Sequence, residues 1–247
     1  MGFLNKLGIG GGNAREAARV SSNGHSEKKL HNGTLAVGAT RTPEAQETTR
    51  VSNGLKEFMW NLEGLGRGTL LDLGPAWQTT LSFFIEKGFR VTSEDILRGW
   101  TEFLKEQESQ AKDNLNADYY AERLPEARAK KFLGENLHYP AGSFDAVLIW
   151  DLLDYLEPTL AKSTVAHLTE LLRPGGVVLA LFHSKKPEGF QRYRVADTST
   201  LQVLTAKTIC PAQKVYQNRE IQELFSRYRS VKSFIGRDQL RENLFIK

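Results

Sequence analysis

The stretch Gly142-Ser-Phe-Asp-Ala-Val-Leu-Ile-Trp-Asp-Leu-Leu-Asp-Tyr-Leu156 decides the fold of this 247-residue chain. Its centre, residues 144–150, is a nearly continuous apolar run, with a glycine before it and an acidic residue directly after it. Such a run is typical of a strand that is covered on both faces, as in a parallel sheet with helices on either side.

Strand and helix patterns alternate on both sides of this run. Apolar strands are predicted at residues 69–73, 89–93, 129–133 and 177–182, in addition to 144–150. Helices are predicted at residues 42–62, 77–87, 97–128 and 158–172. The repeated order of strand and helix predicts an α/β fold, in which a mainly parallel sheet carries helices on both faces.

The last third of the chain predicts antiparallel strands. Residues 191–195 and 201–206 indicate a hairpin inserted after the fifth strand, and a helix begins near Asn218. Residues 231–235 and 244–246 predict a closing hairpin. We therefore expect a Rossmann-like, seven-stranded mixed sheet, with six parallel strands and a last strand that runs antiparallel between its neighbours.

Composition divides the chain into a tail and a body. Residues 1–41 hold eight of the 21 glycines, and Phe3 is their only aromatic residue. Because this segment has little to bury, we expect a flexible, disordered tail. Residues 42–247 are expected to form the folded domain, with the inserted hairpin at about residues 190–207.

Charge and composition exclude several kinds of partner. The net charge of +4 lies mostly in residues 1–50, where seven Lys and Arg face four Glu, so the nearly neutral body offers no basic face for nucleic acid. No apolar run approaches the roughly 20 residues of a membrane span, and the first 12 residues do not form a secretory signal. A single cysteine, Cys210, leaves no disulfide and no zinc cluster. We expect a cytoplasmic protein without metal, membrane or nucleic-acid partners.

Three stretches resemble the class I S-adenosylmethionine-dependent methyltransferase family, small-molecule type. Thr69-Leu-Leu-Asp-Leu-Gly74 resembles the first motif, an acidic residue and a glycine at the end of the first strand. The stretch 142–156 resembles the fourth strand with its following loop, and Leu171-Leu-Arg-Pro-Gly-Gly-Val-Val-Leu-Ala180 resembles the turn into the fifth strand. The resemblance covers residues 55–247 and implies S-adenosylmethionine as the cofactor.

The first motif departs from the family pattern of an acidic residue followed by three alternate glycines. Asp72 and Gly74 match it, but Ala76 and Gln78 replace the second and third glycines. A dinucleotide site needs backbone N–H groups close to a pyrophosphate, and the intervening Pro75 has none. The loop therefore disfavours NAD and FAD. S-adenosylmethionine has no phosphate, so the resemblance still implies cofactor contacts at Asp72, Gly74 and Ala76.

The resemblance places the ribose partner at the end of the second strand. Asp95 follows the first-motif acid by 23 positions, and its carboxylate is implied to accept both ribose hydroxyls. Glu94 is the alternative partner. The other interpretation of Asp95 is a solvated acid in a loop, with no role in cofactor binding. The implied cofactor set also includes Ile96, Glu135 and Asn136, the last two where the family holds adenine.

Two tryptophans have open interpretations. Trp150 and Asp151 end the fourth strand at the edge where open α/β sheets bind ligands. The indole of Trp150 is interpreted either as a face for the sulfonium cation or as core packing, and Trp77 has the same two interpretations. His183, directly after the fifth strand, is a candidate proton acceptor by position, or a structural histidine.

The sequence thus predicts an S-adenosylmethionine-dependent methyltransferase with an unidentified, small-molecule acceptor. A base is needed only if the nucleophile carries a proton, so no catalytic residue is assigned. The alternative is a methyltransferase-fold protein that has lost catalysis and serves as a binding or regulatory partner. The sequence indicates no oligomeric state.

Overall fold

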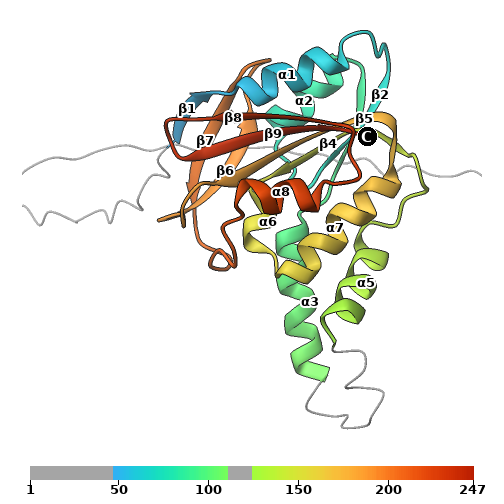
Figure 1. Cartoon of the computed structure of the whole chain (residues 1–247), viewed down its shortest axis with the longest axis vertical. Coiled ribbons are helices and arrows are strands. Elements are labelled where there is room, and N and C mark those ends of the chain that lie inside the picture. Colours follow the sequence, from blue (N-terminus) through green and yellow to red (C-terminus); the bar gives the residue numbers. More distant parts are fainter. Residues whose placement is uncertain (1–46, 111–123) are drawn as a thin grey trace, which may run out of the picture. The chain divides into compact units, whose positions relative to one another are not determined.

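The structure is a computed structural model, and it describes residues 47–110 and 124–247 (Figure 1). The tail predicted over residues 1–41 lies outside the described residues. The elements are β1 Glu47–Val51, α1 Asn53–Leu62, β2 Gly68–Asp72, α2 Gln78–Glu86, β3 Phe89–Ser93, α3 Ile96–Gln110, α5 Pro125–Asn136, β4 Phe144–Trp150, α6 Leu152–Tyr155, α7 Pro158–Leu171, β5 Leu172–His183, β6 Phe190–Val195, β7 Thr200–Ala206, α8 Asn218–Leu224, β8 Ser230–Ile235 and β9 Leu240–Ile246.

The main sheet has the strand order β3-β2-β4-β5-β9-β8. The first four of these strands are parallel neighbours, and β9 runs antiparallel to both β5 and β8. This confirms the predicted α/β class and the last strand that is antiparallel between its neighbours. The number of strands differs, because the main sheet has six within the described residues and not seven.

The missing strand is the one expected at residues 129–133, which lie inside helix α5. Pro125 stands at the first turn of this helix, a position that proline favours. The buried residues Ala129, Phe132 and Leu133 recur at i, i+3 and i+4, which is the spacing of one helix face. The segment therefore covers the sheet as a helix.

Both faces of the main sheet are buried, which explains the continuous apolar run of β4. Val147 and Ile149 pack into a cluster with residues of α5 and α7, whereas Ala146 and Leu148 pack with residues of α1 and α2. Figure 1 shows α1 and α7 on opposite sides of the sheet. No helix of the described residues is long and apolar enough to cross a membrane.

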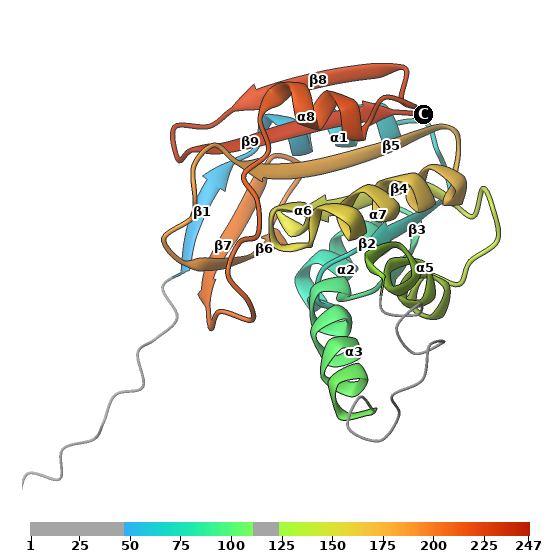
Figure 2. The ribbon, with the colours of Figure 1, turned by 60° about the horizontal axis from the view of Figure 1, so that its bottom comes forward.

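A second, three-stranded sheet has the order β1-β7-β6 and is antiparallel throughout. The helix expected from residue 42 is wrong over β1, where the β-branched Thr48, Thr49 and Val51 pair with β7 and helix α1 starts only after Ser52. Figure 2 shows this small sheet at the end of the main sheet toward which β5 points. It therefore lies near the carboxyl ends of the parallel strands.

Candidate functional site

The carboxyl ends of β2 and β4 meet in the middle of the main sheet. Strand β3 lies on one side of β2 and β4 on the other, so the direction in which the sheet grows reverses between β2 and β4. Ligands of open α/β sheets bind outside the carboxyl ends of the strands at such a point. Asp72 ends β2 and Trp150 ends β4, with Asp151 next in the chain, so the structure brings these three predicted residues to the same place.

Asp72 is a buried carboxyl group with one oxygen unused. Its Oδ1 accepts hydrogen bonds from Nε1 of Trp150 at 2.7 Å and from the backbone N–H of Gly74 at 3.0 Å. Its Oδ2 is buried and has no hydrogen-bond partner among the described residues. Burial raises the pKa of Asp72 to about 6, so the group is mostly a buried anion at neutral pH. A buried acceptor of this kind is stabilised by a ligand that brings an N–H donor.

Trp150 stands over the first-motif loop. Its backbone φ of 54° lies in the left-handed region, which bulky residues rarely adopt. A Cβ built on Gly74 would lie 2.9 Å from both Cδ1 and Nε1 of the indole. Gly74 is therefore required here by the close approach of Trp150.

The small sheet covers Trp150 from the other side. The ring of Tyr193 on β6 stacks on the indole, with ring centroids 5.8 Å apart and planes at 12°. The hydroxyl of Tyr193 donates to Oδ2 of Asp151 at 3.2 Å. Tyr193 is absent from the sequence prediction. Only the alternation of buried Tyr193 and Val195 along β6 indicates that this face of the hairpin is covered.

Two arginines of β6 extend toward the predicted cofactor residues. Arg192 forms an ion pair with Asp95, from Nη2 to Oδ2 at 3.4 Å, and the guanidinium of Arg194 lies 4.0 Å above the ring of Trp77. The other oxygen of Asp95 accepts from the backbone N–H of Arg98 at 3.3 Å, so Asp95 also caps helix α3. Both contacts of Asp95 are long, and its side chain is 19% exposed, which leaves it accessible to a ligand.

His183, the last residue of β5, is held between two buried carboxyl groups. Oδ2 of Asp154 accepts from the backbone N–H of His183 at 2.7 Å and lies 3.0 Å from Nδ1. Nε2 lies 3.7 Å from Oδ2 of Asp151. Burial lowers the pKa of His183, but the hydrogen bond to Asp154 and the charges of both carboxyl groups outweigh burial and raise it. Burial raises the pKa of Asp151 to about 6 and also raises that of Asp154.

A pocket of about 290 Å³ opens beside His183. Its lining includes Lys185 and Lys186, which follow β5, and Gln191 of β6 together with Gln239 in the turn before β9. The small sheet and the carboxyl end of β5 thus share one pocket, which offers both hydrogen-bonding and charged groups.

The remaining predicted residues lie apart from these contacts. Ala76 and Glu135 are exposed, and Ile96 is buried in the core. Asn136 donates from Nδ2 to the carbonyl of Phe132 one turn earlier in α5, so it is used within its own helix. Glu94, the alternative ribose partner, accepts a hydrogen bond from the hydroxyl of Tyr139.

Two hydrogen-bond acceptors of the site suit S-adenosylmethionine, and one side chain blocks the space beside them. The unpartnered oxygen of Asp72 and the accessible carboxylate of Asp95 suit an ammonium group and ribose hydroxyls, respectively. The indole of Trp150, however, fills the space directly over Gly74. Among the described residues, no three His, Cys, Asp or Glu side chains are arranged as a metal site.

Comparisons with known proteins find likeness only among solved structures. No family model matches the chain, and no curated protein is similar to it. The 1,6-didemethyltoxoflavin-N1-methyltransferase of Burkholderia thailandensis, with bound 1,6-didemethyltoxoflavin and S-adenosylhomocysteine, is 17% identical over 79% of each chain, with a TM-score of 0.42. TehB of Haemophilus influenzae is 13% identical over 77% of this chain and 61% of its own, with a TM-score of 0.42. A SAM-dependent methyltransferase of Aquifex aeolicus is 11% identical over 79% of this chain and 90% of its own, with a TM-score of 0.40.

The strand order of the described sheet defines the class of fold. Four parallel strands are followed by an edge hairpin whose last strand inserts antiparallel beside β5. This is the arrangement that the sequence resemblance implies. The chain has the fold of the class I S-adenosylmethionine-dependent methyltransferases.

Proposed function

We propose that this chain binds S-adenosylmethionine and transfers its methyl group to a small-molecule acceptor. The observation that carries the proposal is the pair of acids, Asp72 and Asp95, at the ends of the neighbouring strands β2 and β3, beside the point where the sheet reverses. A buried acceptor oxygen and an accessible carboxylate together suit a ligand that has both an ammonium group and a ribose.

The task of the protein in this reaction is positioning. When bound, the cofactor supplies an electrophilic methyl group on a sulfonium. The chain's own residues must then hold the acceptor in line and keep water out. Trp150, Tyr193 and Asp151 are all buried, so the floor of the site at the carboxyl end of β4 is shielded from solvent.

His183 is the residue that we assign to removal of a proton from the acceptor. Asp154 binds its Nδ1 side and its backbone, which fixes the orientation of the ring, while Nε2 lies 3.7 Å from Oδ2 of Asp151 and makes no hydrogen bond within the described residues. His183 also lines the pocket of about 290 Å³, which is a volume suited to a small molecule. An acceptor that docks there through an O–H or N–H group would lie beside His183.

Isothermal titration calorimetry of the full chain with S-adenosylmethionine and S-adenosylhomocysteine tests the proposal. The wild-type protein should bind both. Asp95→Ala removes two charge-assisted hydrogen bonds, each worth about 1.5–3 kcal/mol, so its affinity should fall on the order of 100-fold or more.

Asp95→Asn is the matched control, because the amide oxygen still caps the N–H of Arg98 and only one acceptor oxygen is lost. It should weaken binding less than Asp95→Ala does. Glu94→Gln should leave affinity unchanged, since Glu94 is bonded to Tyr139. A wild-type protein that ignores both compounds at millimolar concentration would refute the proposal and favour a non-catalytic binding partner.

A further inference from the structure

The contacts of Trp150 compete with those that a cofactor would make, and the inference drawn from them rests on the proposed function. The indole N–H donates to Oδ1 of Asp72 at 2.7 Å, and the ring leaves no room for even a methyl group on Gly74. At the carboxyl end of β2, the side chain of Trp150 thus binds the carboxylate of Asp72 and fills the space over the backbone of Gly74.

The same residue is held in a backbone conformation that is unusual for its type. Trp150 has a φ of 54°, a left-handed conformation that glycine and short polar residues adopt more readily than a bulky tryptophan does. Such a conformation persists only where the surroundings impose it, and it is often found where a site changes state. Here the surroundings are Asp72 on one side and the stacked ring of Tyr193 on the other.

Asp72 is left half satisfied by this arrangement. Oδ2 is buried with no partner among the described residues, and a single indole N–H has only one hydrogen to give. An ammonium group has three, so it satisfies the carboxylate more completely than Trp150 does. The cofactor carries such a group at its methionine end.

We propose that Trp150 is a displaceable plug, whose indole occupies the place of the cofactor's ammonium group at Asp72. In this state the site is closed by Trp150 and by Tyr193 above it. Binding requires the indole to turn away from Gly74, after which Asp72 accepts the ammonium. Tyr193 holds the indole in the closed position, because its ring stacks on the indole and its hydroxyl is hydrogen-bonded to Asp151.

Three variants and two compounds test the plug by calorimetry. Trp150→Phe loses the N–H donor, and Tyr193→Ala removes the cover while leaving Asp72 and Trp150 intact. Both should bind more tightly than wild type by at least about tenfold, because an open state that is populated at 10% or less weakens the apparent affinity by that factor. Trp100→Phe, which alters a buried tryptophan of α3 outside the site, should bind as wild type does.

S-adenosylhomocysteine separates this plug from a cation-binding face, because it keeps the ammonium group but has no sulfonium charge. A plug predicts tighter binding of both compounds by Trp150→Phe. If Trp150→Phe weakens S-adenosylmethionine alone, the indole is a platform for the sulfonium, and the plug is wrong. Equal affinities for wild type, Trp150→Phe and Tyr193→Ala also overturn it, while leaving the proposed function standing.

Intrinsic fluorescence gives a readout that does not depend on affinity. Turning the indole of Trp150 out of its buried position should shift the emission of the wild-type protein to longer wavelength when S-adenosylhomocysteine binds. Trp150→Phe should lack that shift, whereas Trp100→Phe should keep it. Failure of every variant to bind either compound would instead remove the proposed function itself.

Discussion

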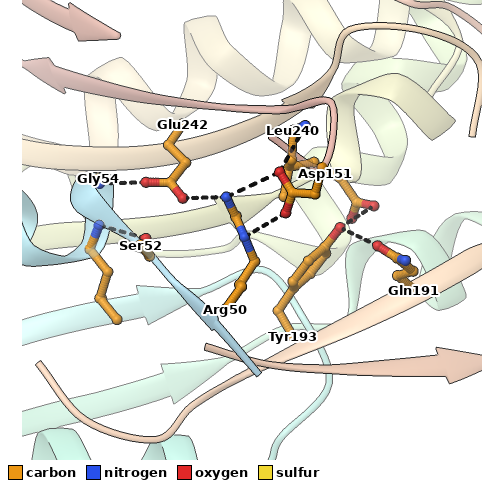
Figure 3. A network of polar contacts seen from close by, with 10 residues as sticks. Arg50, Ser52, Gly54, Asp151, Gln191, Tyr193, Leu240 and Glu242 are labelled. Carbon is orange, nitrogen blue, oxygen red and sulfur yellow. Dashed lines mark hydrogen bonds and ion pairs between the residues drawn. The ribbon is translucent and has the colours of Figure 1, made fainter. Parts of the chain in front are cut away.

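The ion pairs of Arg50 allow the sharpest test of how the small sheet is attached to the main one. Arg50 lies on β1, and its Nη2 is 2.8 Å from Oε1 of Glu242 on β9 (Figure 3). Its Nε is 2.8 Å from Oδ2 of Asp238. The side chain of Glu242 is only 2% exposed, and its other oxygen accepts from the backbone N–H of Gly54. Arg50→Met removes the positively charged partner that this buried carboxylate has within residues 47–110 and 124–247.

The expected cost follows from that burial. Removing one partner of a buried ion pair typically destabilises a protein by about 3–5 kcal/mol, because the remaining charge stays in a poorly solvated place. For a domain of this size each kcal/mol lowers the melting temperature by about 2–4 °C. Arg50→Met should therefore melt roughly 6–20 °C below wild type, as measured by circular dichroism and checked by urea unfolding.

A double-mutant cycle isolates the pair from other effects of the substitution. In Arg50→Met/Glu242→Gln no charge is left buried alone, so the double variant should be more stable than Arg50→Met by about 2 kcal/mol or more. Asp238→Asn is the control, since Asp238 is half exposed and such a pair contributes at most about 1 kcal/mol. If Arg50→Met and Asp238→Asn lose the same small amount, Glu242 does not depend on Arg50, and the reasoning fails.

Two further predictions concern the buried acids of the site. Burial raises the pKa of Asp72 from 3.8 to about 6, so the folded state binds this proton more tightly, and its contribution to stability is present below about pH 4 and lost as the pH rises through about 6. The stability of Asp72→Asn relative to wild type should therefore increase by about 2 kcal/mol between pH 4 and pH 7 in urea unfolding, and a constant difference would contradict this. Asp154→Asn should lower the pKa of His183, because the opposing effect of burial then dominates. NMR titration of the imidazole, assigned with His183→Gln, measures this, and an unchanged midpoint would show that Asp154 does not hold the ring.

The elements that the sequence predicts well are those whose burial is complete. Strand β4 is buried at every position, so its pattern does not depend on which neighbour covers it. Strand β1 is different, because Glu47–Val51 is mostly exposed and becomes a strand by pairing with β7, about 150 residues further along the chain. Strand formation of this kind depends on a distant partner, which local patterns do not reveal.

The features of the site fall into the same two groups, those that the local sequence predicts and those that depend on distant contacts. The positions of Asp72 and Trp150 at strand ends follow from the strands themselves, and the sequence predicts both. The hydrogen bond between them joins residues 78 positions apart, and it depends on a left-handed φ that no local signal indicates for a tryptophan. Tyr193 lies on β6, and the face of β6 that packs on Trp150 becomes clear only when the small sheet is seen against the main one.

Gly74 shows why the first motif, which lacks two of the three glycines of the family pattern, is a weak guide to cofactor binding. The sequence resemblance implies a cofactor contact at this glycine. In this structure a Cβ at the same position would collide with Trp150, so packing within the protein alone is sufficient to require glycine there. The presence of Gly74 therefore does not distinguish a site that binds a cofactor from one that is filled by its own side chain. The unpartnered oxygen of Asp72 is the feature that a ligand would satisfy, because a buried carboxylate oxygen normally accepts a hydrogen bond.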